Sequence, residues 1–359
     1  MDLADIFTRA DKPKTEKWQL GSLVRTELKD HSIVLFFCSD YRGAGGSAEV
    51  QDWNTVRDEL YRLSALDWEV PLCDLGDLVS GNTPADTDYI LQEIISTCRK
   101  RNCVPVTVGG ANSQSYSLFS ALAHCQESVN YTALDSRIRL AHNNEVLNDD
   151  NFLPRILSSE QISRGSYHHL AYQKHLTESD SVRLMKEVDL DVVRLAEMTG
   201  DPANVEPYFR HADLVTVNCD AVESFTGAFS INPQVNGLNR REICAYMKEA
   251  GMSEQLKAVG IFNFNTEQRR QLNHQLLAQM IWHLVEGIQI RKSHPRNRDY
   301  ETFWIMVEDR ELAFHRDVFT DLWYFGTDEE VDNCIPCSRQ DFDLAKEGKL
   351  PPRLLRKLS

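Results

Sequence analysis

Polar and charged side chains follow three apolar runs of the sequence, at the points where extended strands would end. Residues two apart at a strand end project to the same side, so each run would direct its polar groups toward a common point. Such carboxylates, amides and guanidinium groups could bind a metal ion or form internal ion pairs. The positions are Asn112 after VTVGGA; Asp135, Arg137 and Arg139 in ALDSRIR; and Asn218 and Asp220 in VTVNCD.

These runs belong to a longer alternation of short strands and helical stretches. The alternation predicts an α/β fold of three layers, with a doubly wound, mainly parallel sheet covered by helices on both faces. In such sheets ligands bind beyond the carboxyl ends of the strands, which is where the polar residues fall. The expected strands are 32–37, 104–108, 129–134, 191–195, 214–218 and 258–264, and the expected helices are 52–64, 86–101, 113–124, 239–251 and 266–286.

No linker or internal repeat divides residues 31–290, which we interpret as one α/β domain. Residues 1–30 should form an N-terminal lead-in of a helix and a loop. The pattern changes at 291, and we expect 291–359 to add C-terminal strands and a tail packed on the same domain. Within that appendage, 301–316 is typical of two strands around a turn.

The longest expected helix has a clear beginning and one apolar face. Thr266 can cap its first turn, and the apolar residues recur every four positions from Leu272 to Ile288. This periodicity predicts a helix that packs on the core.

The three polar segments, in this order and at these distances, resemble the ureohydrolase superfamily of arginases, agmatinases and formimidoylglutamases. In that family a Gly-Gly-Asp-His motif, an Asp-x-His-x-Asp motif and an Asp-x-Asp motif bind two manganese ions that share an activated hydroxide. DVVRLAE (191–197) and the segment 235–265 look like the formimidoylglutamase branch, and the resemblance covers roughly residues 30 to 290. It implies the arginase-type fold and a homo-oligomer.

The resemblance also implies which residues stand at the metal-ligand positions, and only Asp135 and Asp220 keep the family's residue type. Ser113 and Asn265 lie beside the replaced positions and would line a ligand pocket together with Asn263. The replacements are Asn112 at the first histidine, Arg137 and Arg139 at the second motif's histidine and aspartate, Asn218 at the third motif's first aspartate, and Asn263 at the substrate-gripping glutamate of a Glu-x-Asn-Pro motif.

This set of residues does not suit a pair of metal ions. Hard divalent ions need several carboxylates or imidazoles, whereas arginine offers only donors. Without metal, nothing lowers the pKa of a bound water from about 15.7 toward about 7. We therefore expect no cofactor, no catalytic residue and a non-catalytic scaffold or binder of a small polar metabolite. Arg137 and Arg139 should pair with Asp135 and Asp220, unless both arginines turn outward to solvent.

Two other interpretations remain open at this stage. The chain could be an active manganese-dependent hydrolase of linear amidines that recruits ligands from His142, Asp149, Asp150 or His211. It could instead be a thiol redox protein, because Cys334 and Cys337 have the spacing of a redox pair. The remaining conspicuous histidines, His168 and His169, are adjacent on a strand-like segment, face opposite sides and are interpreted as structural.

The composition of the chain indicates which classes of partner and which cellular location to expect. The net charge of −15 disfavours nucleic acid, and no apolar run of 18 residues or secretory signal appears, so we expect a cytoplasmic protein without a membrane segment. Nine scattered cysteines indicate reduced thiols. The loop 39–50 has glycines but no nucleotide-binding spacing, so it should form a pocket rim.

Overall fold

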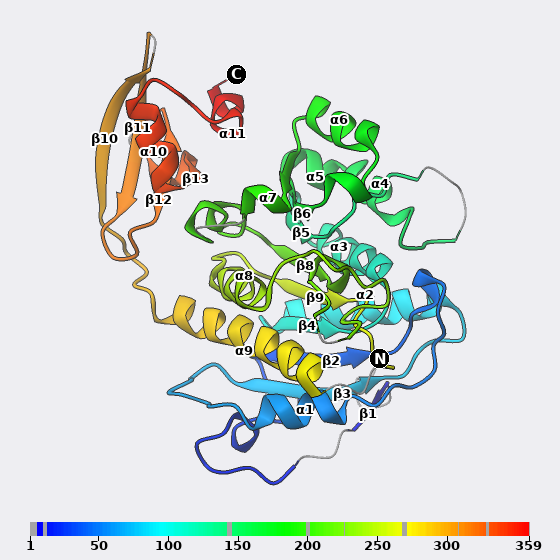
Figure 1. Ribbon diagram of the computed structural model, residues 1–359. Helices are drawn as coiled ribbons and strands as arrows, with labels where there is room; N and C mark the ends of the chain where they lie inside the picture. Colours follow the sequence, from blue (N-terminus) through cyan, green and yellow to red (C-terminus); the bar gives the residue numbers. More distant parts are fainter. Residues whose placement is uncertain are drawn as a thin grey trace.

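The structure is a computed structural model of the 359-residue chain. It describes residues 6–9, 13–141, 146–198, 202–225, 227–267, 271–307, 309–327 and 330–358. Figure 1 shows a large α/β body, with a smaller β-rich unit attached where the long helix α9 ends.

The body is built on a nine-stranded sheet with the order β1-β3-β2-β4-β9-β8-β5-β6-β7. Every neighbouring pair is parallel except β1 and β3, which are antiparallel. This confirms the predicted α/β class and mainly parallel sheet. The strands are β1 (Phe7–Thr8), β2 (Ile33–Cys38), β3 (Leu72–Leu78), β4 (Val104–Val108), β5 (Asn130–Leu134), β6 (Ser166–Tyr172), β7 (Asp191–Arg194), β8 (Leu214–Asn218) and β9 (Ala258–Phe262).

Helices cover both faces of this sheet, and each face has its own apolar core. One core packs α1, α8 and α9 on the sheet, and the other packs α2 to α6. The three layers are therefore those expected from the alternation of strands and helices. The helices are α1 (Asn54–Tyr61), α2 (Pro84–Lys100), α3 (Ser115–Ala123), α4 (Phe152–Leu157), α5 (Glu160–Arg164), α6 (Ser179–Glu187), α7 (Leu195–Met198), α8 (Arg240–Met252) and α9 (Gln271–Ser293).

The long helix α9 packs on the core largely as its periodicity predicts. Met280, Leu284 and Ile288 are buried, but Leu272 is 56% exposed because it lies in the first turn, before the helix crosses the core. The residues that Thr266 would cap, 268 and 269, lie outside the described residues; the Thr266 hydroxyl donates to the Gln51 side chain.

The N-terminal lead-in differs from the expectation. In place of a helix, Phe7–Thr8 add the antiparallel edge strand β1 next to β3, and Leu20–Ser22 form only a short 3₁₀ turn. The strand β3 was also missed, because Asp74 and Asp77 interrupt its apolar residues.

A buried guanidinium makes this acidic strand possible. The Arg57 side chain is fully buried; its Nε lies 2.8 Å from Asp74 Oδ2 and its Nη2 lies 2.7 Å from Asp77 Oδ1. The Tyr61 hydroxyl also donates to Asp74, and the guanidinium stacks 4.2 Å from the centroid of the Phe37 ring. One cation thus partners two carboxylates of β3, either of which would be costly there without a cation.

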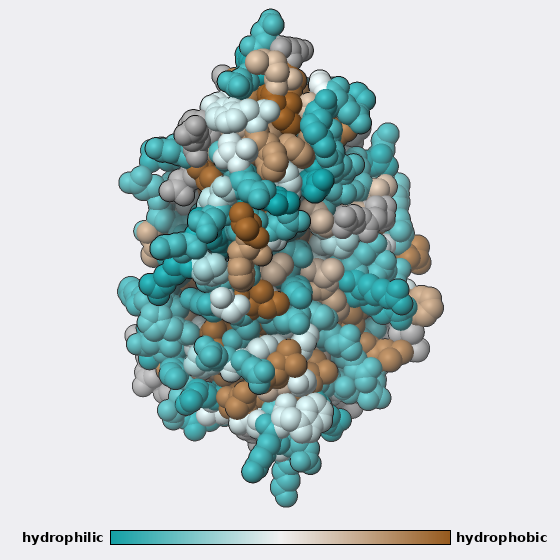
Figure 2. All heavy atoms as spheres, turned by 90° about the vertical axis from the view of Figure 1, so that its left-hand side faces the viewer, coloured by the Kyte–Doolittle hydropathy of each residue, from teal (hydrophilic) through white to brown (hydrophobic). Residues whose placement is uncertain are grey.

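The C-terminal unit is a four-stranded antiparallel sheet with its own core around Phe314, Trp323 and Phe342. The expected pair of strands is its β10–β11 hairpin, and two further strands were not predicted. Figure 2 shows the side of the molecule on which this unit lies. That surface is mostly hydrophilic, with hydrophobic residues scattered among the hydrophilic ones. The elements are β10 (Tyr300–Val307), β11 (Arg310–Asp317), β12 (Trp323–Gly326), β13 (Ile335–Cys337), α10 (Arg339–Lys346) and α11 (Pro352–Leu355).

Arg210 joins this unit to the α/β body. Its buried guanidinium pairs with Glu206 and donates to the backbone carbonyls of Trp323 and Cys337. Cys334 and Cys337 are both buried free thiols, and burial raises the pKa of Cys337, which opposes formation of the reactive thiolate. The redox interpretation gains no support here.

Among the described residues, no helix is both long and apolar enough to cross a membrane.

Replacing Arg57 with methionine should destabilise the protein by about 3–5 kcal/mol, because the buried carboxylate of Asp74 and the partly buried one of Asp77 lose their cation. Urea unfolding at pH 7 measures the change. The matched control is Arg183→Met, since the Arg183 side chain is 64% exposed in its pairs with Asp180 and Glu187. That control should cost under about 1 kcal/mol. Equal losses in the two variants would contradict the assigned role of Arg57.

Candidate functional site

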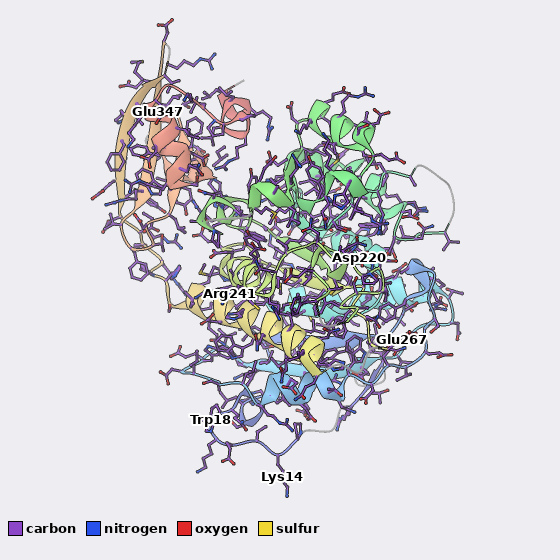
Figure 3. All side chains as sticks on the ribbon, viewed as in Figure 1. Lys14, Trp18, Asp220, Arg241, Glu267 and Glu347 are labelled. Atoms are coloured by element: carbon purple, nitrogen blue, oxygen red, sulfur yellow. The ribbon has the colours of Figure 1, made fainter. Side chains whose placement is uncertain are left out.

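Four neighbouring strands bring the sequence-predicted residues together at the carboxyl edge of the sheet. Across the order β4-β9-β8-β5, the strand ends carry Asn112, Asn263, Asn218 and Asp135 in turn. Asp220 follows β8 in the interior of the α/β body (Figure 3). The structure thus places all six predicted metal positions in one region, together with Asn263.

The turn after β4 depends on glycine. Gly109 and Gly110 have φ angles of 84° and 80°, in the left-handed region. A Cβ on Gly109 would lie 2.4 Å from the Cys38 carbonyl oxygen and 2.4 Å from the Trp53 ring. The two glycines therefore let the chain turn tightly and place Asn112 at the sheet edge.

Asp135 is held by neutral donors. Its Oδ2 accepts hydrogen bonds from the side-chain amides of Asn112 and Asn218, both at 3.0 Å. Its Oδ1 accepts from the backbone N–H of Arg137 at 3.1 Å. Asn218 is oriented in turn because its amide oxygen accepts the backbone N–H of Asp220. Three N–H donors thus occupy most of the roughly four acceptor sites of the Asp135 carboxylate.

A second carboxylate, Asp149, enters the site from a loop. Its Oδ1 accepts from the backbone of Ser113 and its Oδ2 accepts from the Asn263 amide, both at 2.8 Å. Asn263 has a φ of 59°, and its amide oxygen accepts the backbone N–H of Asn112 at 3.2 Å. Burial raises the pKa of Asp149. The motif comparison did not place this carboxylate in the site, because it follows no strand.

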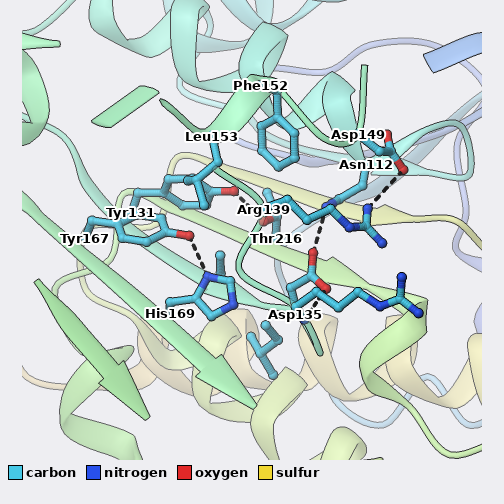
Figure 4. Close-up of a pocket in the computed structure, with 13 residues that line it drawn as sticks. Asn112, Tyr131, Asp135, Arg139, Asp149, Phe152, Leu153, Tyr167, His169 and Thr216 are labelled. Carbon is cyan, nitrogen blue, oxygen red and sulfur yellow. Dashed lines mark hydrogen bonds and ion pairs between the residues drawn. The ribbon is translucent and has the colours of Figure 1, made fainter. Parts of the chain in front are cut away.

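Arg139 supplies the positive charge of the site. Its guanidinium lies 3.4 Å from Asp220, 3.8 Å from Asp149 and 3.5 Å from Asp150, and its side chain is only 13% exposed. Burial lowers the pKa of Arg139, but the attraction of the surrounding carboxylates outweighs burial, so the pKa is raised overall. Burial and repulsion from Asp135 raise the pKa of Asp220 to about 6 against the attraction of Arg139. One guanidinium therefore lies within 4 Å of three carboxylates. Figure 4 shows its contact with Asp149.

The expected pairing of two arginines with two aspartates is half right. Arg139 pairs with Asp220, but Arg137 contacts Asp135 through its backbone, and its side chain forms no ion pair with any residue the structure describes. Neither side chain turns outward to solvent as the alternative supposed, because both line the same cavity.

That cavity is almost filled. Its volume is about 10 Å³, close to the minimum for one water molecule. His169 lies on its wall, buried, with Nδ1 2.9 Å from the Tyr167 hydroxyl, and its Nε2 has no hydrogen-bond partner among the described residues. His168 instead contacts the Tyr208 carbonyl, so the two histidines face different surroundings, as predicted.

The expected ligand pocket of Ser113, Asn263 and Asn265 does not coincide with this cavity. None of the three lines the cavity, because Asn263 is fully buried in its hydrogen bonds and Asn265 accepts from the backbone of Glu267. The loop 39–50 does reach the site, since the Gly43 carbonyl accepts the backbone N–H of Asp149.

The described residues at this edge are not arranged to hold a metal ion. Within the described ranges, no three His, Cys, Asp or Glu side chains converge closely enough to hold a metal ion. Of the alternative ligands considered, Asp149 and Asp150 contact Arg139, and His211 packs beside Tyr324 of the C-terminal unit. His142 lies outside the described residues.

No family model and no curated protein matches the sequence, but solved structures match the fold. The formiminoglutamase of Trypanosoma cruzi with manganese is 18% identical, with a TM-score of 0.67 over 78% of this chain and 100% of that chain. The formimidoylglutamase of Bacillus subtilis is 15% identical (TM-score 0.64; 79% and 95% covered). The proclavaminate amidinohydrolase of Streptomyces clavuligerus is 14% identical (TM-score 0.61; 75% and 95% covered). The chain has the arginase-type fold.

Arg139→Met and Arg137→Met make a matched pair that tests the charge arrangement. Loss of Arg139 should cost about 3–5 kcal/mol, because Asp149 and Asp220 would remain buried without a cation. Loss of Arg137 should cost under about 1 kcal/mol, because its side chain forms no ion pair in the described structure and its Nε is already an unsatisfied buried donor. Denaturant unfolding of both variants at pH 7 gives the comparison. A larger loss of unfolding free energy for Arg137→Met than for Arg139→Met would refute this charge arrangement.

Proposed function

We propose that this chain belongs to the ureohydrolase superfamily, on the formimidoylglutamase-like side, and does not hydrolyse amidines by a two-metal mechanism. It would act as a scaffold or as a binder of a small polar metabolite. The shared fold supports membership, together with the order of the three polar segments along the chain.

One observation carries the proposal: the Arg139 guanidinium lies among Asp149, Asp150 and Asp220. A metal ion bound by these carboxylates would have to displace a side chain that is already paired and mostly buried. Guanidinium stays protonated at any physiological pH, so it cannot become a ligand. A cation therefore already lies among these carboxylates, although it carries less charge than a dication would.

Two further features support the same conclusion. Asp135, the other acid kept from the family pattern, directs its oxygens at amide donors from Asn112 and Asn218. A cavity of about 10 Å³ also has no room for an amidine substrate, since small-molecule sites usually measure about 300 Å³ or more. Binding of a small polar metabolite at this edge would require Arg139 to move.

We also infer, from the family resemblance, that the chain forms a homo-oligomer. Light scattering coupled to size-exclusion chromatography tests this inference, and a monomer at micromolar concentration would contradict it.

Restoring the family's ligands should restore metal binding. The variant carries Asn112→His, Arg137→His, Arg139→Asp and Asn218→Asp, which together with Asp135 and Asp220 completes the ligand pattern. After incubation with Mn²⁺ and desalting, elemental analysis should find about two manganese ions per chain in the variant and under about 0.2 in the unaltered protein. Arg139→Met alone is the control, and it should stay free of manganese because it removes the cation without adding a ligand.

The unaltered protein decides the question even if the fourfold variant fails to fold. About two tightly held manganese ions per chain, with hydrolysis of formimidoylglutamate, agmatine or arginine, would overturn the proposal and establish the active-enzyme alternative.

A further inference from the structure

A second, open cleft lies at the amino-terminal edge of the sheet, away from Arg139. Its volume is about 950 Å³, within the range of sites that hold a nucleotide-sized molecule. The residues that begin β2 and β4 form its floor, and the last turns of α2 and α9 form its sides. Because the strands are parallel, this edge is opposite to the one that carries Asp135 and Asp220.

The lining of this cleft is strongly basic, although the chain as a whole has a net charge of −15. Glu254 is the one carboxylate among the lining residues. Six cations share the lining: Arg99, Lys257, Arg291, Lys292, Arg296 and Arg298.

Two of the six cations are neutralised by neighbouring acids. Lys257 lies 2.5 Å from Asp213, and Arg298 lies 2.5 Å from Glu254 and 3.1 Å from Asp317. The other four have no carboxylate within 4.0 Å in the part of the chain that the structure describes; they are Arg99, Arg291, Lys292 and Arg296. Four positive charges, from two helix ends and the segment after α9, thus face one cleft without a carboxylate ion pair, although Arg291 also donates to the Ser253 carbonyl.

Helix dipoles do not account for this excess. Arg99 lies in the last turn of α2, and Arg291 and Lys292 lie in the last turn of α9. Each helix end carries only about half a negative charge, so the two ends together offset about one of the four cations. In addition, the Nε of Arg99 is buried and has no hydrogen-bond partner among the described residues. A donor left unsatisfied beside an open, basic cleft indicates a missing acceptor.

We propose that this cleft binds a small anion that carries two or more phosphate groups. Arginine forks and a nearby lysine suit phosphate oxygens, and several cations without a carboxylate partner, spread over two helix ends and the segment after α9, suit a chain of phosphates better than a single phosphate. The rim residue Tyr300, 36% exposed, offers an aromatic edge beside the cations. The site is independent of the proposed function, because it uses the opposite sheet edge and none of its residues.

Isothermal titration calorimetry with inorganic tripolyphosphate, inorganic phosphate and ATP tests the proposal on the full-length protein. Tripolyphosphate should bind, and single phosphate should bind at least about tenfold more weakly because it can reach fewer cations. Binding should weaken as salt is raised, because screening reduces the attraction. If ATP binds more tightly than tripolyphosphate, the nucleoside contributes; equal affinity means that the phosphate chain alone is recognised, and either result supports the proposal.

Charge reversal gives the matched comparison. The double variant Lys292→Glu and Arg296→Glu changes two exposed residues of the cleft and should weaken tripolyphosphate binding at least about tenfold. Lys14→Glu with Arg241→Glu alters the net charge equally at exposed positions outside the cleft (both labelled in Figure 3) and should leave the affinity unchanged. Absence of tripolyphosphate binding to the unaltered protein, or equal weakening in both double variants, would overturn the proposal.

Discussion

The carboxyl edge of the sheet depends on one ion-pair cluster, in which the Arg139 guanidinium holds the acids Asp149 and Asp220. Parallel strands bring their ends to the same edge, so acids far apart in sequence meet where little water reaches them. Buried carboxylates without a cation either take up protons or destabilise the fold. The pKa values of Asp149 and Asp220 stay raised, because burial outweighs the attraction of Arg139.

Neutral side-chain amides supply the hydrogen bonds that one guanidinium cannot give to all the carboxylates of this edge. A continuous set of hydrogen bonds runs across four strand ends, with Asn263 joining Asp149 to the backbone of Asn112, and Asn112 and Asn218 both donating to Asp135. Amides can satisfy carboxylate oxygens without adding charge that would itself need compensation. The consequence is an edge whose amides and carboxylates are largely bound to one another, while Asp220 Oδ1, Arg137 Nε and His169 Nε2 have no hydrogen-bond partner among the described residues.

The sequence predicted the sheet well where strands were apolar, as in Val104–Val108 and Leu214–Asn218, which were placed without error. It missed β3, because the acids in that strand are neutralised by Arg57 from a helix, which no local pattern reveals. The pairing of Arg137 was wrong for a different reason. Period-two spacing directs side chains to one side only in an extended strand, and β5 ends at Leu134, before the first of these residues.

The two edges of the same sheet have opposite excesses of charged side chains. At the carboxyl edge, the acids outnumber the cation and are satisfied by a guanidinium and amides, which leaves a cavity of about 10 Å³. At the amino edge, cations outnumber acids around a cleft of about 950 Å³. The strand β4 begins at Val104 in that cleft and leads to the glycine turn before Asn112. A ligand at the amino edge would therefore contact the strand that positions Asn112 at the carboxyl edge. Each edge of the sheet is therefore shaped by its own balance of charge.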